Sequence, residues 1–215
     1  MAEKRDSPYI WVTWIPQIMV GSRVCLWGPW FKTHYKGLPA PATDYRLAVR
    51  TTEHAERVGK LADGIRAAGY SVSVENENVF RVRRGGLTIG GKPDVVCWDT
   101  KGQYIVYDVK TGAKKDADVV QVMLYMTLLP YSKRFVGKTL AGRIIPSEGG
   151  YINICLSGCL LKCLLSPHST LLFVDVTGST IVDRLNRLRI FLIRKLFPPI
   201  HPLSTDTFCQ NHLSY

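Results

Sequence analysis

The 215-residue sequence contains no apolar run long enough to cross a membrane as a helix. A membrane-spanning helix needs roughly 20 consecutive apolar residues, whereas the most apolar tract, 152–176, is interrupted by Lys162, Pro167 and His168. The charged start, MAEKRDSPY, is not followed by the apolar segment of a secretory signal peptide. These absences predict a cytoplasmic protein with no attachment to a membrane.

A disulfide framework and internal repeats are not expected either. The six cysteines are spread from residue 25 to residue 209, and a reducing cytoplasm keeps thiols free. No segment recurs at a fixed period. Hydrophobic residues make up 46% of the chain, so we expect an apolar core of ordinary size to hold the fold together.

Acidic residues are outnumbered by basic ones. Asp and Glu total 17, whereas Lys and Arg total 28, which gives a formal charge of +11. Such an excess favours a polyanionic partner, with nucleic acid first and an anionic membrane surface second. At roughly 100–200 residues per domain, the length fits one domain with extensions or one and a half domains.

The spacing of apolar residues predicts an α/β fold, with a central mixed β-sheet flanked by helices. An amphipathic helix is expected over 51–68, ending at Gly69, and a second helix over 115–129. The short turn at 99–102 makes the two strands around it an antiparallel hairpin. Strands are expected at 70–74, 79–82, 87–89, 94–98 and 104–110, with a further pair within 142–154.

The sequence divides into a core at 48–155 and two helical extensions. Residues 1–47 are rich in aromatic side chains, which form either a packed face or a platform that stacks on unpaired bases. Four of them have the spacing of one helical face: Trp27, Trp30, Phe31 and Tyr35. Residues 156–215 form a diverged C-terminal extension with a basic helix at 179–196.

The expected hairpin carries two carboxylates and an amine at one end. Residues i and i+2 of a strand point to the same face, so Asp108 and Lys110 lie together, while Asp94 begins the partner strand. Two adjacent carboxylates repel unless a cation lies between them, and hard oxygen ligands suit Mg²⁺ or Mn²⁺. The backbone carbonyl of Val109 is a further candidate metal ligand. In such a site, Lys110 would help to activate water or stabilise charge on a phosphate.

Each of these motifs also has an ordinary structural explanation. Asp-x-Lys on a strand is commonly a solvated ion pair, and Pro93-Asp94 alone is typical of a turn. Their combination between Gly91 and Thr111-Gly112, in front of apolar strands, favours a metal site instead.

The run GKPD…YDVKTG, followed by Gln121-x-x-x-Tyr125, resembles the RecB-like branch of the PD-(D/E)XK nucleases. This branch includes the nuclease domains of helicase–nucleases and the iron–sulfur CRISPR-associated exonucleases. The resemblance covers residues 48–155 and implies a restriction-endonuclease-like core. It also implies that the protein binds a divalent metal ion and cleaves DNA.

The resemblance assigns further site residues. A histidine from the helix before the sheet commonly joins the metal ligands in this branch, and His54 is the matching residue. Gln121 and Tyr125 form either a solvent-exposed rim or part of the active cleft, and the resemblance favours the cleft. The expected catalytic set is Asp94, Asp108, Lys110, Gln121 and Tyr125.

Members of the branch often hold a [4Fe–4S] cluster with one cysteine before the core and three near the C-terminus. Cys25 and Cys209 stand at two of these places, but Asp206 occupies another and no cysteine follows Cys209. Because this set is incomplete, we do not expect an intact cluster. The alternative is that the cysteines are small buried apolar residues.

The expected function is metal-dependent hydrolysis of DNA phosphodiester bonds by an exonuclease. Its substrate would be single-stranded DNA or free ends, in repair, recombination or CRISPR-type processing. The alternatives are a restriction-type endonuclease and an inactive nucleic-acid-binding module on the same fold. Contacts to phosphate carry affinity without sequence information. The candidate phosphate contacts are Arg81, Arg83, Arg84, Lys92, Lys114 and Lys115.

Overall fold

The computed structural model describes residues 2–22, 25–38, 45–113 and 115–154. The chain separates into two units, Met1–Gly178 and Ser179–Tyr215, and every described residue belongs to the first. The basic helix predicted at 179–196 lies outside the described residues, as do Lys114 and Cys209. No helix in the described part is long and apolar enough to cross a membrane.

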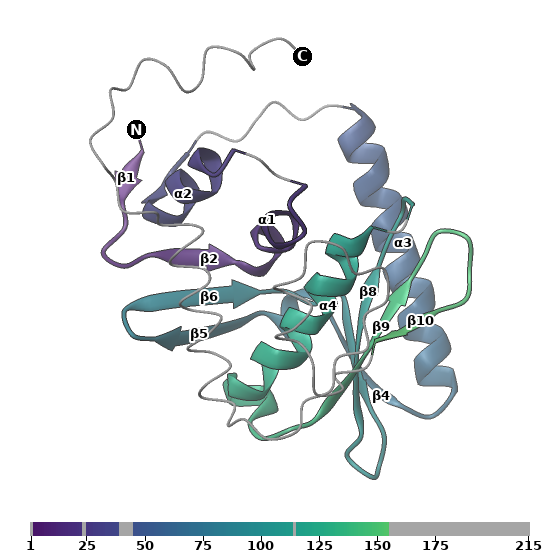
Figure 1. Cartoon of the computed structure of the whole chain (residues 1–215). Coiled ribbons are helices and arrows are strands. Elements are labelled where there is room, and N and C mark those ends of the chain that lie inside the picture. Colours follow the sequence, from purple (N-terminus) through teal and green to yellow (C-terminus); the bar gives the residue numbers. More distant parts are fainter. Residues whose placement is uncertain (1, 23–24, 39–44, 114, 155–215) are drawn as a thin grey trace. The chain divides into compact units, whose positions relative to one another are not determined.

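A five-stranded mixed sheet forms the centre of the first unit (Figure 1). Its strands are β4 (Ser71–Val74), β7 (Val95–Trp98), β8 (Tyr104–Val109), β9 (Leu140–Ile145) and β10 (Ile152–Ile154). In space they follow the order β10-β9-β8-β7-β4. Strands β8 and β9 are parallel, whereas the other three pairs are antiparallel. The predicted hairpin of β7 and β8 and the predicted mixed sheet are therefore confirmed.

Two helices, α3 (Tyr45–Ala67) and α4 (Asp116–Leu128), cover opposite faces of this sheet. Figure 1 shows α4 on the near side of the sheet and α3 on the far side. Side chains alternate along a strand, so Tyr107 and Val109 of β8 pack toward α3, while Asp108 contacts α4. The central strand thus presents apolar residues to one helix and a carboxylate to the other.

Helix α3 begins at Tyr45 rather than near residue 51 as predicted. Tyr45 at its start is 80% exposed, so this aromatic residue did not mark a buried helical face. The predicted end is confirmed: Gly69 has a φ of 86° and donates its N–H to the carbonyl of Arg66. A left-handed glycine at this place is a common helix terminator.

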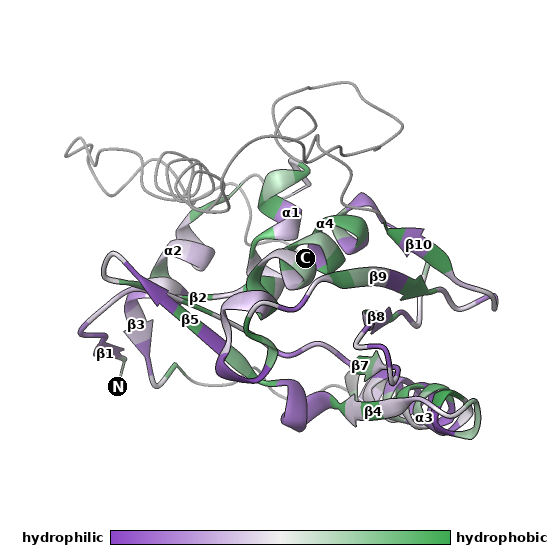
Figure 2. Cartoon of the chain, turned by 90° about the horizontal axis from the view of Figure 1, so that it is seen from below, coloured by the Kyte–Doolittle hydropathy of each residue, from purple (hydrophilic) through white to green (hydrophobic). Residues whose placement is uncertain are grey.

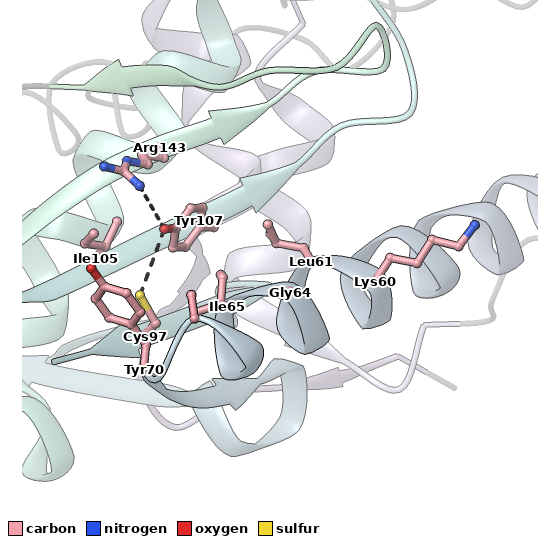
Figure 3. A pocket seen from close by; sticks show the side chains of 10 residues that line it. Lys60, Leu61, Gly64, Ile65, Tyr70, Cys97, Ile105, Tyr107 and Arg143 are labelled. Carbon is pink, nitrogen blue, oxygen red and sulfur yellow. Dashed lines mark hydrogen bonds between the residues drawn. The ribbon is translucent and has the colours of Figure 1, made fainter.

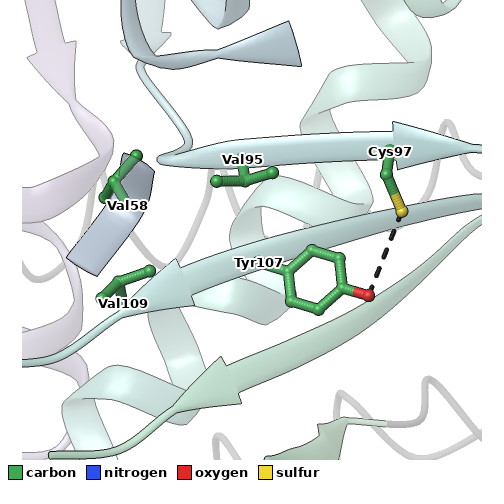
Figure 4. Packing of buried hydrophobic residues seen from close by; sticks show 5 residues of the cluster. All are labelled: Val58, Val95, Cys97, Tyr107 and Val109. Atoms are coloured by element: carbon green, nitrogen blue, oxygen red, sulfur yellow. Dashed lines mark hydrogen bonds between the residues drawn. The ribbon is translucent and has the colours of Figure 1, made fainter. Parts of the chain in front are cut away.

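An apolar cluster lies between α3 and the sheet (Figure 4). Its buried members are Val58, Val95, Cys97, Tyr107 and Val109. Burial of each large apolar side chain contributes about 1.5–3 kcal/mol, so this cluster fixes α3 firmly against β7 and β8. Because Val58 is held in the cluster, His54 one turn earlier on α3 faces the same side.

A second sheet has three strands, β2 (Tyr9–Trp11), β5 (Phe80–Arg84) and β6 (Leu87–Gly91). Its order is β2-β6-β5, with β2 parallel and β5 antiparallel to β6. The sequence predicted β5 and β6 but not β2. A three-residue strand that pairs with a segment far along the chain leaves no local pattern, because its pairing is a long-range event.

The remaining short elements precede α3 or connect the larger ones. The elements before α3 are β1 (Glu3–Lys4), η1 (Val12–Trp14), α1 (Pro16–Met19), α2 (Trp27–His34) and β3 (Tyr35–Lys36), and β1 pairs with β3. The later ones are η2 (Glu75–Asn78), η3 (Leu129–Tyr131) and η4 (Lys133–Phe135).

Three of the four aromatic residues with helical spacing lie on α2, and Tyr35 is the first residue of β3. The ring centroids are 5.0 Å apart for Trp27 and Phe31 and 4.5 Å apart for Phe31 and Tyr35. Pro29 is accommodated because it lies in the first turn, where a backbone N–H has no partner within the helix. Trp30 contacts the rings of His34 and Tyr35, with centroids 4.7 Å and 6.3 Å away.

Candidate active site

Two carboxylates meet where β7 begins and β8 ends. Val95 pairs with Tyr107, so Asp94, just before Val95, stands opposite Asp108, just after Tyr107. Residues directly opposite on antiparallel strands share a face of the sheet. The backbone N–H of Val109 donates to Asp94 Oδ2 at 2.7 Å, which ties the two strand ends together.

Asp108 is almost completely buried, with 2% of its surface exposed, because β8 is central and α4 covers it. Its Oδ1 accepts a hydrogen bond of 2.8 Å from the amide of Gln121. Its Oδ2 lies 2.7 Å from Nζ of Lys110 but accepts no hydrogen bond of ordinary geometry. Burial raises the pKa of Asp108 to about 7, against the opposing charge of Lys110, and Asp94 adds to the rise.

Lys110 is held among three polar groups. Its Nζ lies 2.7 Å from Asp108, 3.4 Å from Asp118 Oδ1 and 3.4 Å from Gln121 Oε1. Burial alone would lower the pKa of Lys110, but the charge of Asp108, with the charge of Asp118, raises it above its ordinary value. The amine is therefore an ammonium ion at neutral pH, able to donate hydrogen bonds and unable to accept a proton.

His54 approaches the carboxylates from α3. Its Nε2 lies 3.3 Å from Asp94 Oδ1. The hydrogen bond to Asp94 raises the pKa of His54; burial opposes the rise, and the charges of Asp94, Glu75 and Asp108 add to it. Asp94 thus contacts both the His54 imidazole and the backbone of Val109, and the imidazole also lies near the negative charges of Glu75 and Asp108.

Gln121 and Tyr125 line the site from α4, one helical turn apart. The amide of Gln121 contacts Asp108 at 2.8 Å and the Tyr125 hydroxyl at 3.3 Å. That hydroxyl donates to the backbone carbonyl of Lys92 at 3.3 Å. Tyr125 is only 1% exposed, so this pair does not form a solvent-exposed rim. Gln121 instead bridges the acidic and basic groups of the site.

Two acidic residues near the site were not among the predicted site residues. Asp118 caps α4 by accepting the N–H of Lys115 at 2.9 Å, and its other oxygen faces Lys110. It lies three residues before Gln121, and this helical spacing was the available signal. Glu75 has a φ of 36°, a left-handed conformation that strains a residue with a side chain, and its N–H donates to the carbonyl of Asp94.

The predicted phosphate contacts fall in different places. Lys92 lies beside the site, 4.0 Å from Glu75, and Lys115 is exposed at the start of α4. The three arginines are exposed on β5, which belongs to the other sheet: Arg81, Arg83 and Arg84. Of the cysteines proposed for a cluster, Cys25 is exposed and carries a free thiol, while Cys209 is not described.

The donor set of the site fits a divalent cation. Asp94, Asp108 and the carbonyl of Val109 offer oxygen atoms, and His54 offers an imidazole, which together suit Mg²⁺ or Mn²⁺. A buried carboxylate oxygen without a proper hydrogen bond, Asp108 Oδ2, is a further sign of such a fit. Among the described residues no three His, Cys, Asp or Glu side chains are gathered closely enough to form a metal cluster by themselves.

A pocket of about 370 Å³ lies on the other face of the sheet, between α3 and strands β7 to β9 (Figure 3). In it Arg143 donates to the Tyr107 hydroxyl at 3.1 Å, and Cys97 contacts the same oxygen. Burial raises the pKa of Cys97, so its thiol stays protonated and is a poor nucleophile. None of the predicted catalytic residues lines this pocket.

Comparison with known proteins identifies a family for this chain. The PD-(D/E)XK nuclease superfamily model matches residues 29–155. A solved structure titled "Crystal structure of SSO0001" is 16% identical over 71% of this chain and 69% of that chain, with a TM-score of 0.36. No curated protein matches the sequence. Because the matched residues are more than half of the 215, the chain belongs to the PD-(D/E)XK nuclease superfamily.

Proposed function

We propose that the protein is a metal-dependent deoxyribonuclease that hydrolyses phosphodiester bonds. The observation that carries this proposal is the pairing of Asp94 with Asp108 across β7 and β8, with the ammonium of Lys110 against Asp108. Membership of a nuclease superfamily supports the reaction class. The formal charge of +11 suits a polyanionic substrate.

Asp94, Asp108 and the Val109 carbonyl would hold Mg²⁺ or Mn²⁺, with His54 at the edge of the site. When bound, the cation polarises the phosphoryl oxygen and lowers the pKa of the attacking water. Within the protein, His54 restrains Oδ1 of Asp94, and the Val109 N–H restrains Oδ2 of the same carboxylate. The Asp94 carboxylate is thus held at both oxygens before a substrate arrives.

Lys110 acts on the phosphate as a donor of positive charge. Its pKa is raised because nearby carboxylates outweigh its burial, so it cannot serve as the base that removes a proton from water. Asp118 and Gln121 orient its ammonium group from α4. A positioned ammonium stabilises the charge that develops on the phosphoryl oxygens, an effect worth about 100-fold in rate for one well-placed donor.

The alternative of an inactive binding module is less well supported. A carboxylate that is 2% exposed and has a pKa of about 7 costs free energy when ionised without a cation. Binding of nucleic acid alone does not require a buried, ionisable carboxylate at position 108. The intact arrangement therefore favours an enzyme.

The mode of attack is proposed from the resemblance to the RecB-like branch. We propose an exonuclease that acts at free or single-stranded DNA ends. A restriction-type endonuclease remains the second candidate, because the same centre suits either mode. Covalently closed circular DNA separates them, since an endonuclease cuts it and an exonuclease leaves it intact.

The test of catalysis is cleavage of end-labelled DNA with Mn²⁺ or Mg²⁺. Wild-type protein is expected to cleave, and Asp108→Ala and Lys110→Met proteins are expected to lose at least about 100-fold in rate. Asp63→Asn, which removes an exposed carboxylate paired with Arg66, is the matched control and should keep full activity. Equal cleavage by wild type and both site variants would mean that this centre does not carry the reaction.

A further inference from the structure

One face of the three-stranded sheet combines aromatic rings with arginines. Tyr9 of β2 pairs with Thr88 of β6, which pairs with Arg83 of β5. Two residues further along β2, Trp11 pairs with Gly90 of β6, which pairs with Arg81 of β5. Residues paired directly across strands share a face, as do residues i and i+2. We call this the aromatic–arginine face, formed by Tyr9, Trp11, Thr88, Gly90, Arg81 and Arg83.

The opposite face of the same sheet belongs to the core. Ile10 is 1% exposed and Ile89 is 8% exposed, and these two residues pair with each other. Phe80 of β5 meets the Tyr125 ring of α4 edge-on, with centroids 6.2 Å apart. The aromatic–arginine face therefore points away from the core, and Tyr9 and Trp11 are both partly exposed.

Gly90 lets the two rings lie down on the sheet. A Cβ atom at residue 90 would collide with the Tyr9 hydroxyl and would lie 3.2 Å from the Trp11 ring, so both rings occupy the space that a side chain would take. Their centroids are 6.1 Å apart with planes 25° from parallel. The Arg5 guanidinium lies over the Tyr9 ring, 5.3 Å from its centroid. The two nearly parallel rings thus present apolar surface for stacking with a positive charge beside Tyr9.

The arginines beside the rings carry positive charges that can pair with the negatively charged phosphates of a nucleic acid. Arg81 and Arg83 are exposed, and no described residue forms an ion pair with either. Two residues apart on one strand, they are separated by about 7 Å along the sheet. In Figure 2, much of β5 is coloured toward the hydrophilic end of the scale, and β6 separates it from β2 in the sheet.

We propose that the aromatic–arginine face binds single-stranded nucleic acid. Bases stack on Tyr9 and Trp11, and Arg81 and Arg83 bind the phosphates of the same strand. A duplex keeps its base faces stacked inside the helix and cannot use the rings in this way. The proposal rests on the proposed function for the substrate and deepens it, because it names an unpaired strand and a second surface that grips it.

The test measures binding without cleavage. Fluorescence anisotropy in EDTA compares three labelled DNA probes of equal length: a single strand, an abasic single strand and a blunt duplex. Trp11→Leu keeps apolar volume but removes the stacking surface, and is expected to weaken binding of the normal single strand by about 5- to 100-fold. Binding of the abasic strand should change little, and Trp11→Phe should restore most of the affinity.

The arginines give a second, independent measurement. Arg81→Ala combined with Arg83→Ala is expected to reduce the slope of log affinity against log salt by about 1.4, at about 0.7 for each lost phosphate contact on a single strand. These positions are exposed, so the variant should fold. The matched controls are Trp27→Leu, which removes an aromatic ring that is 61% exposed on α2, and Lys101→Ala with Arg66→Ala, which removes two exposed charges elsewhere.

The proposal is overturned if the wild type binds the duplex as tightly as the single strand, or if the control variants lose as much affinity as the variants of the face. An unchanged salt slope in the double arginine variant would also overturn it. The proposed function fails separately, if Mn²⁺ produces no cleavage while single-strand binding in EDTA persists. Asp108→Ala should lose cleavage and keep this binding.

Discussion

Replacing Asp108 with asparagine is expected to stabilise the metal-free protein while abolishing cleavage. Asp108 is 2% exposed, and burial raises its pKa from 3.8 to about 7. The Asp108 carboxyl therefore binds a proton more tightly in the folded protein than in the unfolded chain. The stability that this protonated carboxyl contributes is fully present below pH 3.8 and is lost as the pH rises to about 7.

The size of the effect follows from the two pKa values. A rise from 3.8 to about 7 corresponds to about 4 kcal/mol of lost stability once the carboxyl is ionised in both states. Asparagine carries no charge and avoids this loss, but it leaves Lys110 with only Asp118 and Gln121 as close partners. We therefore expect the variant to be more stable than wild type by about 2–3 kcal/mol at pH 8.

The assay is urea unfolding in EDTA at a series of pH values from 4 to 8.5. The difference between Asp108→Asn and wild type should grow between pH 4 and 7 and then level off. In wild type the raised pKa of Lys110 lies outside this window, whereas the pKa of His54, which the charge of Asp108 helps to raise, should fall in the variant. Asp63→Asn, at a carboxylate that is 77% exposed, should show no such pH-dependent gain.

Adding Mn²⁺ should reverse the order of stability. A ligand that binds only the folded state stabilises it in proportion to the logarithm of its concentration, so wild type should gain and Asp108→Asn should not. A variant that is less stable than wild type in EDTA at every pH, by a constant amount, would refute the reasoning. In that case the carboxylate would not suffer the desolvation described here.

Three further substitutions test residues that position the groups of the site or pack α4 against the sheet. Gln121→Leu leaves Asp108 Oδ1 without its hydrogen bond and should lower the free energy of unfolding by about 1–3 kcal/mol in EDTA, measured by urea titration. His54→Gln should weaken Mn²⁺ binding by about 10-fold or more in calorimetry; an unchanged affinity would remove His54 from the metal site. Gly142→Ala places a Cβ 2.5 Å from Met126 Sδ and Val122 Cγ1, and should cost about 1–3 kcal/mol, whereas Gly112→Ala, which meets nothing within 4 Å, should cost little.

The hairpin could be predicted from the sequence because its signals are local. Alternating apolar residues, a four-residue turn and the Asp-x-Lys spacing all lie within 94–110, so pairing and side-chain direction followed from strand geometry. The positions of Gln121 and Tyr125 on α4 needed only helical spacing. The distance between Asp108 and Gln121 could not be predicted, because it depends on how closely α4 packs on β8.

The sequence could not predict contacts that join distant segments. Strand β2 pairs with β6 across about 80 residues, and the three residues of β2 show no alternation long enough to recognise. The position of Glu75 at the end of a strand was visible in the sequence, but its φ of 36° and its hydrogen bond to the carbonyl of Asp94 were not. Asp118 has the helical spacing of Gln121, but its contacts to the Lys115 N–H and to Lys110 require the folded site.

Strands β8 and β5 differ in how much of the fold must open to expose them. Strand β8 is hydrogen-bonded to β7 on one edge and to β9 on the other, so its amides should exchange with solvent only when the whole unit unfolds. Strand β5 is the outer strand of its sheet and bonds to β6 alone among the described strands, so smaller fluctuations release it. The carboxylates of Asp94 and Asp108 would then keep their geometry, while the arginines of β5 adjust to the irregular backbone of a single-stranded nucleic acid.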